Sequence, residues 1–366
     1  MAARRNLVIA GAALAVLIIC AAGTAAGIGY LLRPVDAAAG EEIIRVEIEP
    51  EATAGQISLI LTEKGLIRSA FIFRIYARQH QLERNLVAGS YKLKPSMSLP
   101  EIAAKIAGGD ADPETYWFTI PEGYTIEQIA DRLAAASLVD REAFLKEAAQ
   151  PSPQILEQFP FLQESAANSQ VKYVLEGYLF PDTYEIAAGS SEKEIICLML
   201  RRFAAIFNET LRQRCEELQL TQHEALTLAS IIEGEARVEH ERKLIAGVFY
   251  NRLERNYPLE SCATVQYILG EVKEVLSNAD TKLPSSYNTY QNPGLPPGPI
   301  GAPGEASILA ALYPENTDYL FFVSKEDGTG EHYFSRTNSE HERYKELARK
   351  TKRKREAEKA ANRPES

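Results

Sequence analysis

One carboxylate lies in an apolar helical stretch near the middle of the chain, LTLASIIEGEAR (226–237). With 3.6 residues per turn, Glu233 falls near the same face as Leu226 and Ser230. A carboxyl group on such a face loses hydration, which favours its protonated form, the form that a general acid needs. An ion pair with Arg237, one helical turn further on, is the alternative role for this side chain.

The spacing favours a mechanism with one acidic residue over a mechanism with two. Glycosidases usually place a carboxylate on each side of the bond that they cleave. Glu235 is two residues from Glu233, so on a regular helix the two side chains point to opposite sides. We expect the later Glu239 and Glu241 to be solvated or paired with nearby arginines.

The composition is that of a folded, acidic protein. Its 366 residues are 45% hydrophobic, enough for one large or two medium globular domains with their own cores. The formal charge of −10 provides no positive field for a nucleic-acid backbone, so nucleic acid is not an expected partner. Cys197, Cys215 and Cys262 form no CxxC pair and lack the histidine spacing of a zinc site, so no metal is predicted. Disulfide pairing among them stays open at this stage.

The N-terminal segment predicts where the protein works. Residues 7–32 carry no charge and exceed the roughly 20 apolar residues that cross a bilayer as a helix. Arg4 and Arg5 precede this stretch, which predicts a cytoplasmic N-terminus and an extracytoplasmic remainder of the chain. A cleaved signal peptide with small residues at 36–40 is the alternative, but the apolar region is longer than the usual signal core. We therefore expect a single-pass protein of the cell membrane.

A small module follows the predicted anchor. Alternating apolar residues over 44–48 predict a strand, and the spacing over 53–66 predicts a helix after it. Part of that helical sequence recurs at 125–138, which indicates two related units in tandem. Residues 87–110 predict a strand, a turn and a helix that begins with a capping box at Ser98. Residues 44–110 therefore form a compact β-α-α-β-like unit.

The rest of the chain mixes helices with irregular segments. Helices are predicted over 192–218, from Thr221 and from Ser307, and a hairpin is predicted over 319–335. A stretch dense in Gly and Pro, 283–314, predicts an irregular loop of the kind that is usually functional. The charged C-terminal tail is expected to be solvated and is assigned no chemistry.

One aromatic segment, VLEGYLFPDTYEI, suits neither a regular helix nor a regular strand. Its rings at Tyr178, Phe180 and Tyr184 are predicted to lie on an ordered loop. Exposed rings there would stack against a ligand, and buried rings would cap the core beneath the loop. The sequence leaves both roles open.

Three long motifs in order resemble those of one family. LASIIEGEARVEHERKLIAGVFYNRLERNYPLESCATVQYILG (228–270), SSYNTYQNPGLPPGPIGAPGEASILAAL (285–312) and the upstream LEGYLFPDTYEI are similar to the YceG-like, or MltG, family of membrane-anchored endolytic murein transglycosylases. The unit at 44–110 also resembles the LysM-like modules of cell-wall proteins. The resemblance covers about residues 44 to 348.

The resemblance implies an α+β protein with an N-terminal transmembrane helix, a small LysM-like α+β module and a larger α+β catalytic domain. The expected boundaries are 1–6 for the cytoplasmic N-terminus, 7–32 for the transmembrane helix, 33–43 for a linker, 44–110 for the LysM-like module, 111–345 for the YceG-like catalytic domain and 346–366 for the charged tail.

The same resemblance implies roles for particular residues. The catalytic acid of the family falls on Glu233 in ASIIE. The positions implied to bind substrate or line the glycan cleft are Asn251, Arg252, Tyr287, Asn288, Thr289 and Tyr290. Glu176, Tyr178 and Asp182 match the EGYLFPDTY element, with a role that is either site-lining or structural. One departure is Cys262, which stands where many relatives have Asp, so any polarity that this Asp supplies is in doubt here.

The implied reaction is endolytic cleavage of the β-1,4 bond between N-acetylmuramic acid and N-acetylglucosamine in peptidoglycan glycan strands. It leaves 1,6-anhydro-muramic ends and needs no cofactor. The resemblance also implies a terminator of strand elongation with peptidoglycan synthases as neighbours. Two alternatives remain: a hydrolase of the same bond, with a second carboxylate such as Asp182, and a non-catalytic wall-binding protein.

Overall fold

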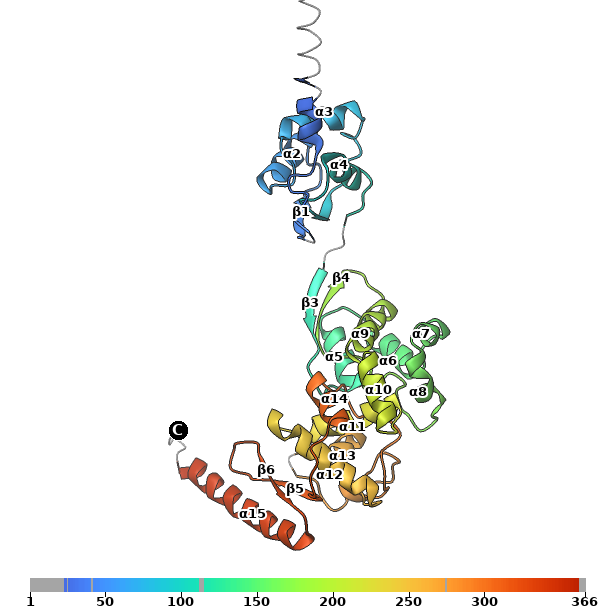
Figure 1. The fold of residues 1–366 in the computed structure, drawn as a ribbon, viewed down its shortest axis with the longest axis vertical. Helices are drawn as coiled ribbons and strands as arrows, with labels where there is room; N and C mark the ends of the chain where they lie inside the picture. Colours follow the sequence, from blue (N-terminus) through green and yellow to red (C-terminus); the bar gives the residue numbers. More distant parts are fainter. Residues whose placement is uncertain (1–22, 25, 41, 112–114, 274, 362–366) are drawn as a thin grey trace, which may run out of the picture. The chain divides into compact units, whose positions relative to one another are not determined.

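A computed structural model of the chain describes residues 23–361, except 25, 41, 112–114 and 274. The described chain forms two compact units, which divide after Thr115 (Figure 1). The predicted cytoplasmic segment and most of the predicted transmembrane segment, 7–32, lie outside the described residues. Within the part that is described, no helix is both long and apolar enough to cross a membrane.

The first unit is a small α+β structure. Its elements are β1 (Ile44–Ile48), α2 (Ala54–Glu63), α3 (Ala70–Gln79), β2 (Gly89–Leu93) and α4 (Leu99–Ala107). β1 and β2 pair antiparallel, with Val46 opposite Tyr91, and both side chains are fully buried beneath the helices. The predicted strand, helix, strand and helix are confirmed, as is the capping box at Ser98.

The tandem repeat is also confirmed. Thr53 and Thr125 each cap a helix, α2 and α5 (Ile126–Ala135), and each accepts a hydrogen bond from the backbone N–H of a glutamine three residues later. Each helix packs against the next one, α3 in the first unit and α6 (Arg141–Ala149) in the second. The same local sequence thus builds a helix pair in both units.

The second unit contains all of β3 (Thr115–Thr119) except its first residue, and this strand forms a two-stranded sheet with β4 (Thr183–Ala187). Its further elements are α7 (Pro153–Gln158), η1 (Pro160–Leu162), α8 (Gln163–Ala167), α9 (Glu192–Ile206), α10 (Glu209–Glu217), α11 (Gln222–Glu235), η2 (Glu239–Glu241), α12 (Arg242–Glu254), α13 (Cys262–Leu269), η3 (Asp280–Lys282), α14 (Glu305–Leu312), β5 (Phe321–Ser324), β6 (His332–Ser335) and α15 (Asn338–Ala361). The predicted α+β class is confirmed for the described residues.

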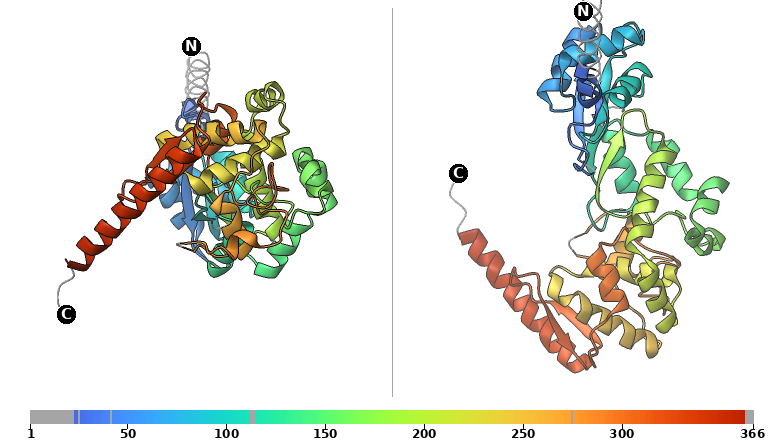
Figure 2. Two further views of the ribbon diagram at one scale, coloured as in Figure 1. Left: turned by 90° about the horizontal axis from the view of Figure 1, so that it is seen from below. Right: turned by 45° about the horizontal axis from the view of Figure 1, so that its top comes forward.

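Helix α11 forms the centre of this unit. Every residue from Ala225 to Ile232 is buried, and α10, α12, α13 and α14 pack around the helix. Its predicted start is confirmed, because Thr221 caps it with a complete capping box. The predicted hairpin is confirmed as β5 and β6, and α15 runs beside this hairpin and extends beyond it (Figure 2).

One expectation for this unit needs correction. The helix predicted over 192–218 is interrupted, because the side chain of Asn208 accepts a hydrogen bond from the backbone N–H of Leu211 and starts α10 anew. The charged tail continues as α15 up to Ala361, and most of its described side chains are exposed, as expected of a solvated segment. Cys197, Cys215 and Cys262 are free thiols, which answers the disulfide question for these three.

Candidate active site

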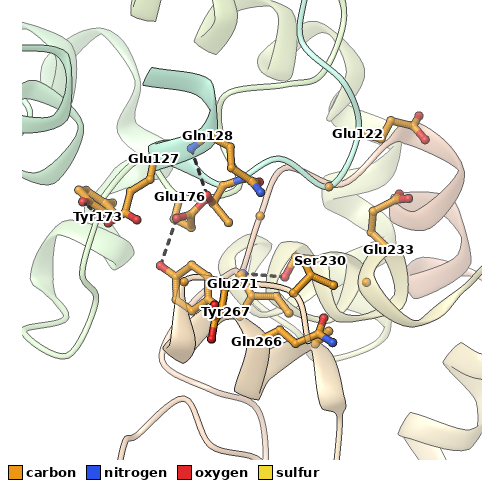
Figure 3. Close-up of a pocket in the computed structure, with 18 of the residues that line it drawn as sticks. Glu122, Glu127, Gln128, Tyr173, Glu176, Ser230, Glu233, Gln266, Tyr267 and Glu271 are labelled. Atoms are coloured by element: carbon orange, nitrogen blue, oxygen red, sulfur yellow. Dashed lines mark hydrogen bonds between the residues drawn. The ribbon is translucent and has the colours of Figure 1, made fainter. Parts of the chain in front are cut away.

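A cavity of about 490 Å³ opens in the second unit beside the C-terminal turn of α11 (Figure 3). It is lined by residues of α5, α11 and α13 and by the loops before α5, between α8 and β4, after α11, after α13 and before α14. The polar residues of its lining are Glu122, Thr125, Glu127, Gln128, Asp131, Lys172, Tyr173, Glu176, Ser230, Glu233, Arg237, Gln266, Tyr267 and Glu271. These residues make up most of the lining, and their charged and hydrogen-bonding groups suit a polar substrate.

Glu233 is fixed at one end of the cavity with only 9% of its side chain exposed. Oε1 accepts a hydrogen bond of 2.9 Å from Nη2 of Arg242, and Oε2 accepts one of 3.1 Å from the backbone N–H of Gly304. Arg242 also donates from Nε to Oγ of Ser307 at 2.9 Å. The carboxylate is therefore held where the N-termini of α12 and α14 meet the C-terminus of α11.

The alternative ion pair between Glu233 and Arg237 does not form. Helix α11 ends at Glu235, and Ala236 adopts an extended backbone with φ −72° and ψ 128°. Arg237 therefore leaves the helical path before the i+4 position, and Arg242 pairs with Glu233 instead.

Glu241 was expected to be solvated or paired with an arginine. It is instead buried and bonded to Nδ1 of His332 at 2.7 Å.

Two loops close over Glu233. The N–H of Gly123 donates to the carbonyl of Ala302 at 2.7 Å, and the N–H of Ala302 donates to the carbonyl of Tyr124 at 2.8 Å. The hydroxyl of Ser230 accepts the N–H of Ile300 at 3.0 Å, which ties the second loop to α11. These three hydrogen bonds hold the two loops to each other and to α11, next to Glu233.

Glu122 is a second carboxylate at the same end of the cavity, and Figure 3 shows it facing Glu233. Its Oε2 lies 3.9 Å from Nη2 of Arg242, with 53% of the side chain exposed. Burial raises its pKa first, the charge of Glu233 raises it further, and Arg242 opposes both effects. Glu122 is not among the residues predicted from the sequence. The Pro-Glu-Gly run at 121–123 is the sequence signal for this turn, and Gly123 indeed has a φ of +76°.

Glu176 lies at the opposite end of the cavity from Glu233 and Glu122 in Figure 3, near Tyr267, Tyr173 and Glu127. Its carboxyl group is 1% exposed and accepts hydrogen bonds from the N–H of Ile126 at 3.0 Å and the hydroxyl of Tyr267 at 3.1 Å. Burial raises the pKa of Glu176 to about 8, although the two hydrogen bonds act in the opposite direction. This end of the cavity therefore holds a carboxyl group that keeps its proton at neutral pH.

Of the residues predicted for the site, Glu233 and Glu176 line the cavity and the other eight do not. Asn251 donates to the carbonyls of Thr317 and Tyr319 at 2.7 and 2.9 Å. Arg252 donates to the carbonyl of Leu320 at 2.6 Å. Both side chains hold the segment that leads into β5.

The tetrad Tyr287, Asn288, Thr289 and Tyr290 lies behind α13. Asn288 is fully buried and donates to the carbonyl of Leu283 at 2.8 Å. Thr289 accepts the N–H of Ser261 at 3.0 Å, and Tyr290 lies 3.2 Å from the sulfur of Cys262. The ring of Tyr287 packs 5.1 Å from the ring of Tyr267, which does line the cavity.

Tyr178 and Asp182 also lie away from the cavity. Tyr178 is fully buried, and its hydroxyl is 2.8 Å from Nδ1 of His223. Asp182 pairs with Arg202 at 2.5 Å. The aromatic rings of this segment are buried, at Tyr178, Phe180 and Tyr184. They therefore cap the core beneath the loop and are not exposed for stacking against a ligand.

Glu235 is placed as its spacing from Glu233 predicted. Its Oε1 accepts hydrogen bonds from the hydroxyl of Ser261 at 2.6 Å and from the N–H of Ala263 at 3.1 Å. A carboxylate at this position satisfies the N-terminal donors of α13 and does not line the cavity. Among the described residues, no cluster of three or more His, Cys, Asp or Glu side chains could hold a metal ion.

Comparison with known proteins gives the family. A sequence model of the YceG-like family matches residues 46–347. The chain belongs to the YceG-like family. A YceG-like protein from Listeria monocytogenes, known from a 2.6 Å crystal structure, is 39% identical to this chain. The match covers 82% of this chain and 99% of the Listeria chain, with a TM-score of 0.59.

Two curated relatives of this YceG-like chain carry the name endolytic murein transglycosylase. The Bacillus subtilis protein is 33% identical over 326 residues, which cover 86% of this chain and 87% of the relative. The Streptococcus pneumoniae R6 protein is 33% identical over 357 residues, which cover 89% of this chain. That match spans 62% of the length of the pneumococcal relative.

Proposed function

We propose that this chain is an endolytic lytic transglycosylase of peptidoglycan. It would cleave the β-1,4 bond between N-acetylmuramic acid and N-acetylglucosamine and leave 1,6-anhydro-muramic ends. The observation that carries the proposal is Glu233, held by Arg242 and Gly304 at the end of a polar cavity. The names of the two curated relatives support the same reaction class.

Glu233 serves first as acid and then as base in this proposal. It protonates the glycosidic oxygen as the bond to the anomeric carbon breaks, and the acetamido group of the sugar stabilises the positive charge on that carbon. The Glu233 carboxylate then takes the proton of the muramyl 6-hydroxyl, whose oxygen bonds to the anomeric carbon. The intramolecular hydroxyl has a high effective concentration, which favours it over water.

Arg242 and Gly304 orient this carboxylate and stabilise the charge that it gains after the first proton transfer. Of the other predicted residues, Glu176 also lines the cavity. Because it is 1% exposed and bonded to Ile126 and Tyr267, it would fix the shape of the cavity wall. The remaining eight would act by supporting the surrounding structure, since seven of their side chains bond to backbone or to neighbouring side chains and the ring of Tyr287 packs against Tyr267. Those residues are Asn251, Arg252, Tyr287, Asn288, Thr289, Tyr290, Tyr178 and Asp182.

The cellular setting of the enzyme is part of the same proposal. The apolar segment 7–32 would anchor the chain in the cell membrane, with a LysM-like module at 44–110 and a catalytic domain at 111–345 outside it. A tethered endolytic enzyme would cut new glycan strands close to the synthases that make them and so end their elongation. The support for this setting is the length of the charge-free segment and the resemblance of the motifs.

A hydrolase of the same bond remains the second candidate, because Glu122 offers a second carboxylate in the cavity. Asp182 would not fill that role, since it pairs with Arg202 away from the cavity. The two reactions differ in their products. A hydrolase leaves reducing ends, and a transglycosylase leaves anhydro ends.

The test is mass spectrometry of the products formed from purified glycan strands by the full chain in detergent. We expect anhydro ends with the native protein and none with Glu233→Gln. The matched control is Glu346→Gln, on the exposed side of α15, which should cut as the native protein does. If the native protein leaves reducing ends, the chain is a hydrolase. If it binds strands without cleaving them, it is a wall-binding protein.

A further inference from the structure

A second hollow adjoins the cavity along α5. It is a shallow groove of about 600 Å³ lined by Phe118, Tyr124, Gln128, Asp131, Arg132, Ala135 and Ala136. Gln128 and Asp131 line both the groove and the cavity that holds Glu233. A ligand that extends from the cavity past these two residues therefore enters the groove.

We infer that this groove is a subsite for a further sugar unit of the glycan strand whose scissile bond lies at Glu233. The inference rests on the proposed function and extends it. An endolytic enzyme binds the interior of a polymer, so the substrate continues beyond the reacting sugars. A hollow that shares two lining residues with the cavity lies where the next unit of the strand would go.

The lining of the groove suits a sugar ring. Phe118 and Tyr124 are half-buried and pack on the core of the unit, so their rings are held in place while part of each stays accessible. Aromatic rings bury the apolar C–H face of a ligand, and tyrosine adds a polar edge. Ala135 and Ala136 are small and exposed at the end of α5, which leaves the groove open to a long ligand.

Arg132 supplies the charge of the groove. Its Nε donates to the carbonyl of Thr119 at 2.8 Å, and its guanidinium lies over the ring of Phe118, 5.4 Å from the ring centre. Within the described chain, no residue accepts a hydrogen bond from its two terminal amino groups. The negative charge of the neighbouring Asp131 is offset by an ion pair with Arg141 at 2.6 Å.

A fixed guanidinium with free amino groups binds carboxylates through paired hydrogen bonds. Muramyl units carry a lactyl group or the peptide built on it, and both end in a carboxylate. We therefore propose that the guanidinium of Arg132 binds this carboxylate on the sugar unit that enters the groove. The polar Gln128 at the junction would face the hydroxyl and acetamido groups of the strand as it passes from cavity to groove.

The experiment compares muramyl–glucosaminyl oligosaccharides of increasing length on the full chain. For cleavage, kcat/KM is measured with the shortest oligomer that is cut and with oligomers two and four sugars longer. For binding, affinity is measured by calorimetry with the Glu233→Gln protein. Two variants test the groove: Arg132→Gln removes the guanidinium, and Ala135→Trp fills the exposed end of the groove. The control is Arg212→Gln on α10, away from both hollows.

We expect native kcat/KM and affinity to rise with length, and each groove variant to lose about tenfold with long oligomers and nothing with the shortest. Arg212→Gln should behave as the native protein at every length. An equal loss at all lengths, or no loss at any length, would overturn the inference. Failure of the proposed reaction is seen separately, as missing anhydro ends, and the binding measurement still decides the groove in that case.

Discussion

Arg242, the first residue of α12, donates a hydrogen bond of 2.9 Å to Oε1 of Glu233 in the last turn of α11. Only 14% of the Arg242 side chain and 9% of the Glu233 side chain are exposed. Arg242 also lies within 3.9 Å of Glu122. A single guanidinium therefore faces both carboxylates of this end of the cavity and fixes the geometry of the one that we propose as the acid.

Replacement of Arg242 should reduce catalysis strongly. In Arg242→Lys the charge remains, but a lysine cannot bond to Ser307 and Glu233 at once with the fork geometry of a guanidinium. We expect kcat to fall about 10²-fold, equivalent to about 3 kcal/mol of transition-state stabilisation. The measurement is the rate of release of anhydro ends, with Arg212→Lys on α10 as control. A kcat within threefold of native would show that Arg242 does not position the acid.

Glu122→Gln separates the two candidate reactions. A transglycosylase needs one carboxylate, so this isosteric change should lower kcat less than about tenfold. A hydrolase that uses Glu122 as its base would lose at least 10²-fold. Both rate and product ends are measured on the same strands. A large loss, together with reducing ends in the native digest, would favour the hydrolase.

The sequence predicted much of the local structure because its signals are local. Capping boxes at Ser98 and Thr221 were visible as residue pairs three positions apart, and each begins the expected helix. The opposite orientations of Glu233 and Glu235 followed from helical geometry alone. The break at Asn208 was missed, since a side-chain cap competes with the helix at a position where the apolar spacing continues.

The composition of the cavity depended on long-range contacts that a single sequence does not contain. Glu122 reaches the site because its loop pairs with the backbone near Ala302, far along the chain. The motif at 285–290 lies between residues that line the cavity in the sequence. Its polar side chains nevertheless bond to the start of α13 and to the neighbouring loops. The motifs predicted the family, which is confirmed, and Glu233 as the proposed acid, whereas long-range contacts determine which motif residues line the cavity.

Gly301→Ala tests the closure of the two loops. A Cβ atom at this position would lie 2.7 Å from the carbonyl oxygen of Gly123, which is backbone and cannot rotate away. We expect a loss of about 1–3 kcal/mol in the free energy of unfolding and a lower kcat, because the loops separate above Glu233. The control, Gly55→Ala, places its Cβ 3.7 Å from Oγ1 of Thr53 in the first turn of α2. It should leave the melting temperature unchanged or slightly raised, and equal melting temperatures for both variants would refute the close contact.

Glu176 should make stability depend on pH. Its pKa is raised from 4.5 to about 8 by burial, so between these values the folded protein keeps a proton that the unfolded chain has lost. The free energy of unfolding then falls as pH rises, by about 1.4 kcal/mol per pH unit, and this contribution levels off above about pH 8. Below about pH 4.5 both states hold the proton, and the contribution of Glu176 is fully favourable there.

Glu176→Gln removes this pH dependence while preserving the shape of the protonated side chain. The glutamine oxygen can still accept the N–H of Ile126, and the neutral amide keeps the size of the protonated carboxyl group beside the hydroxyl of Tyr267. Relative to the native protein, the variant should therefore gain stability steadily from pH 5 to pH 8, measured by thermal unfolding of the full chain. Glu346→Gln on α15 should show no such trend, since that carboxylate is exposed. A stability difference between Glu176→Gln and native protein that stays constant over this range would mean that Glu176 is already ionised in the folded state.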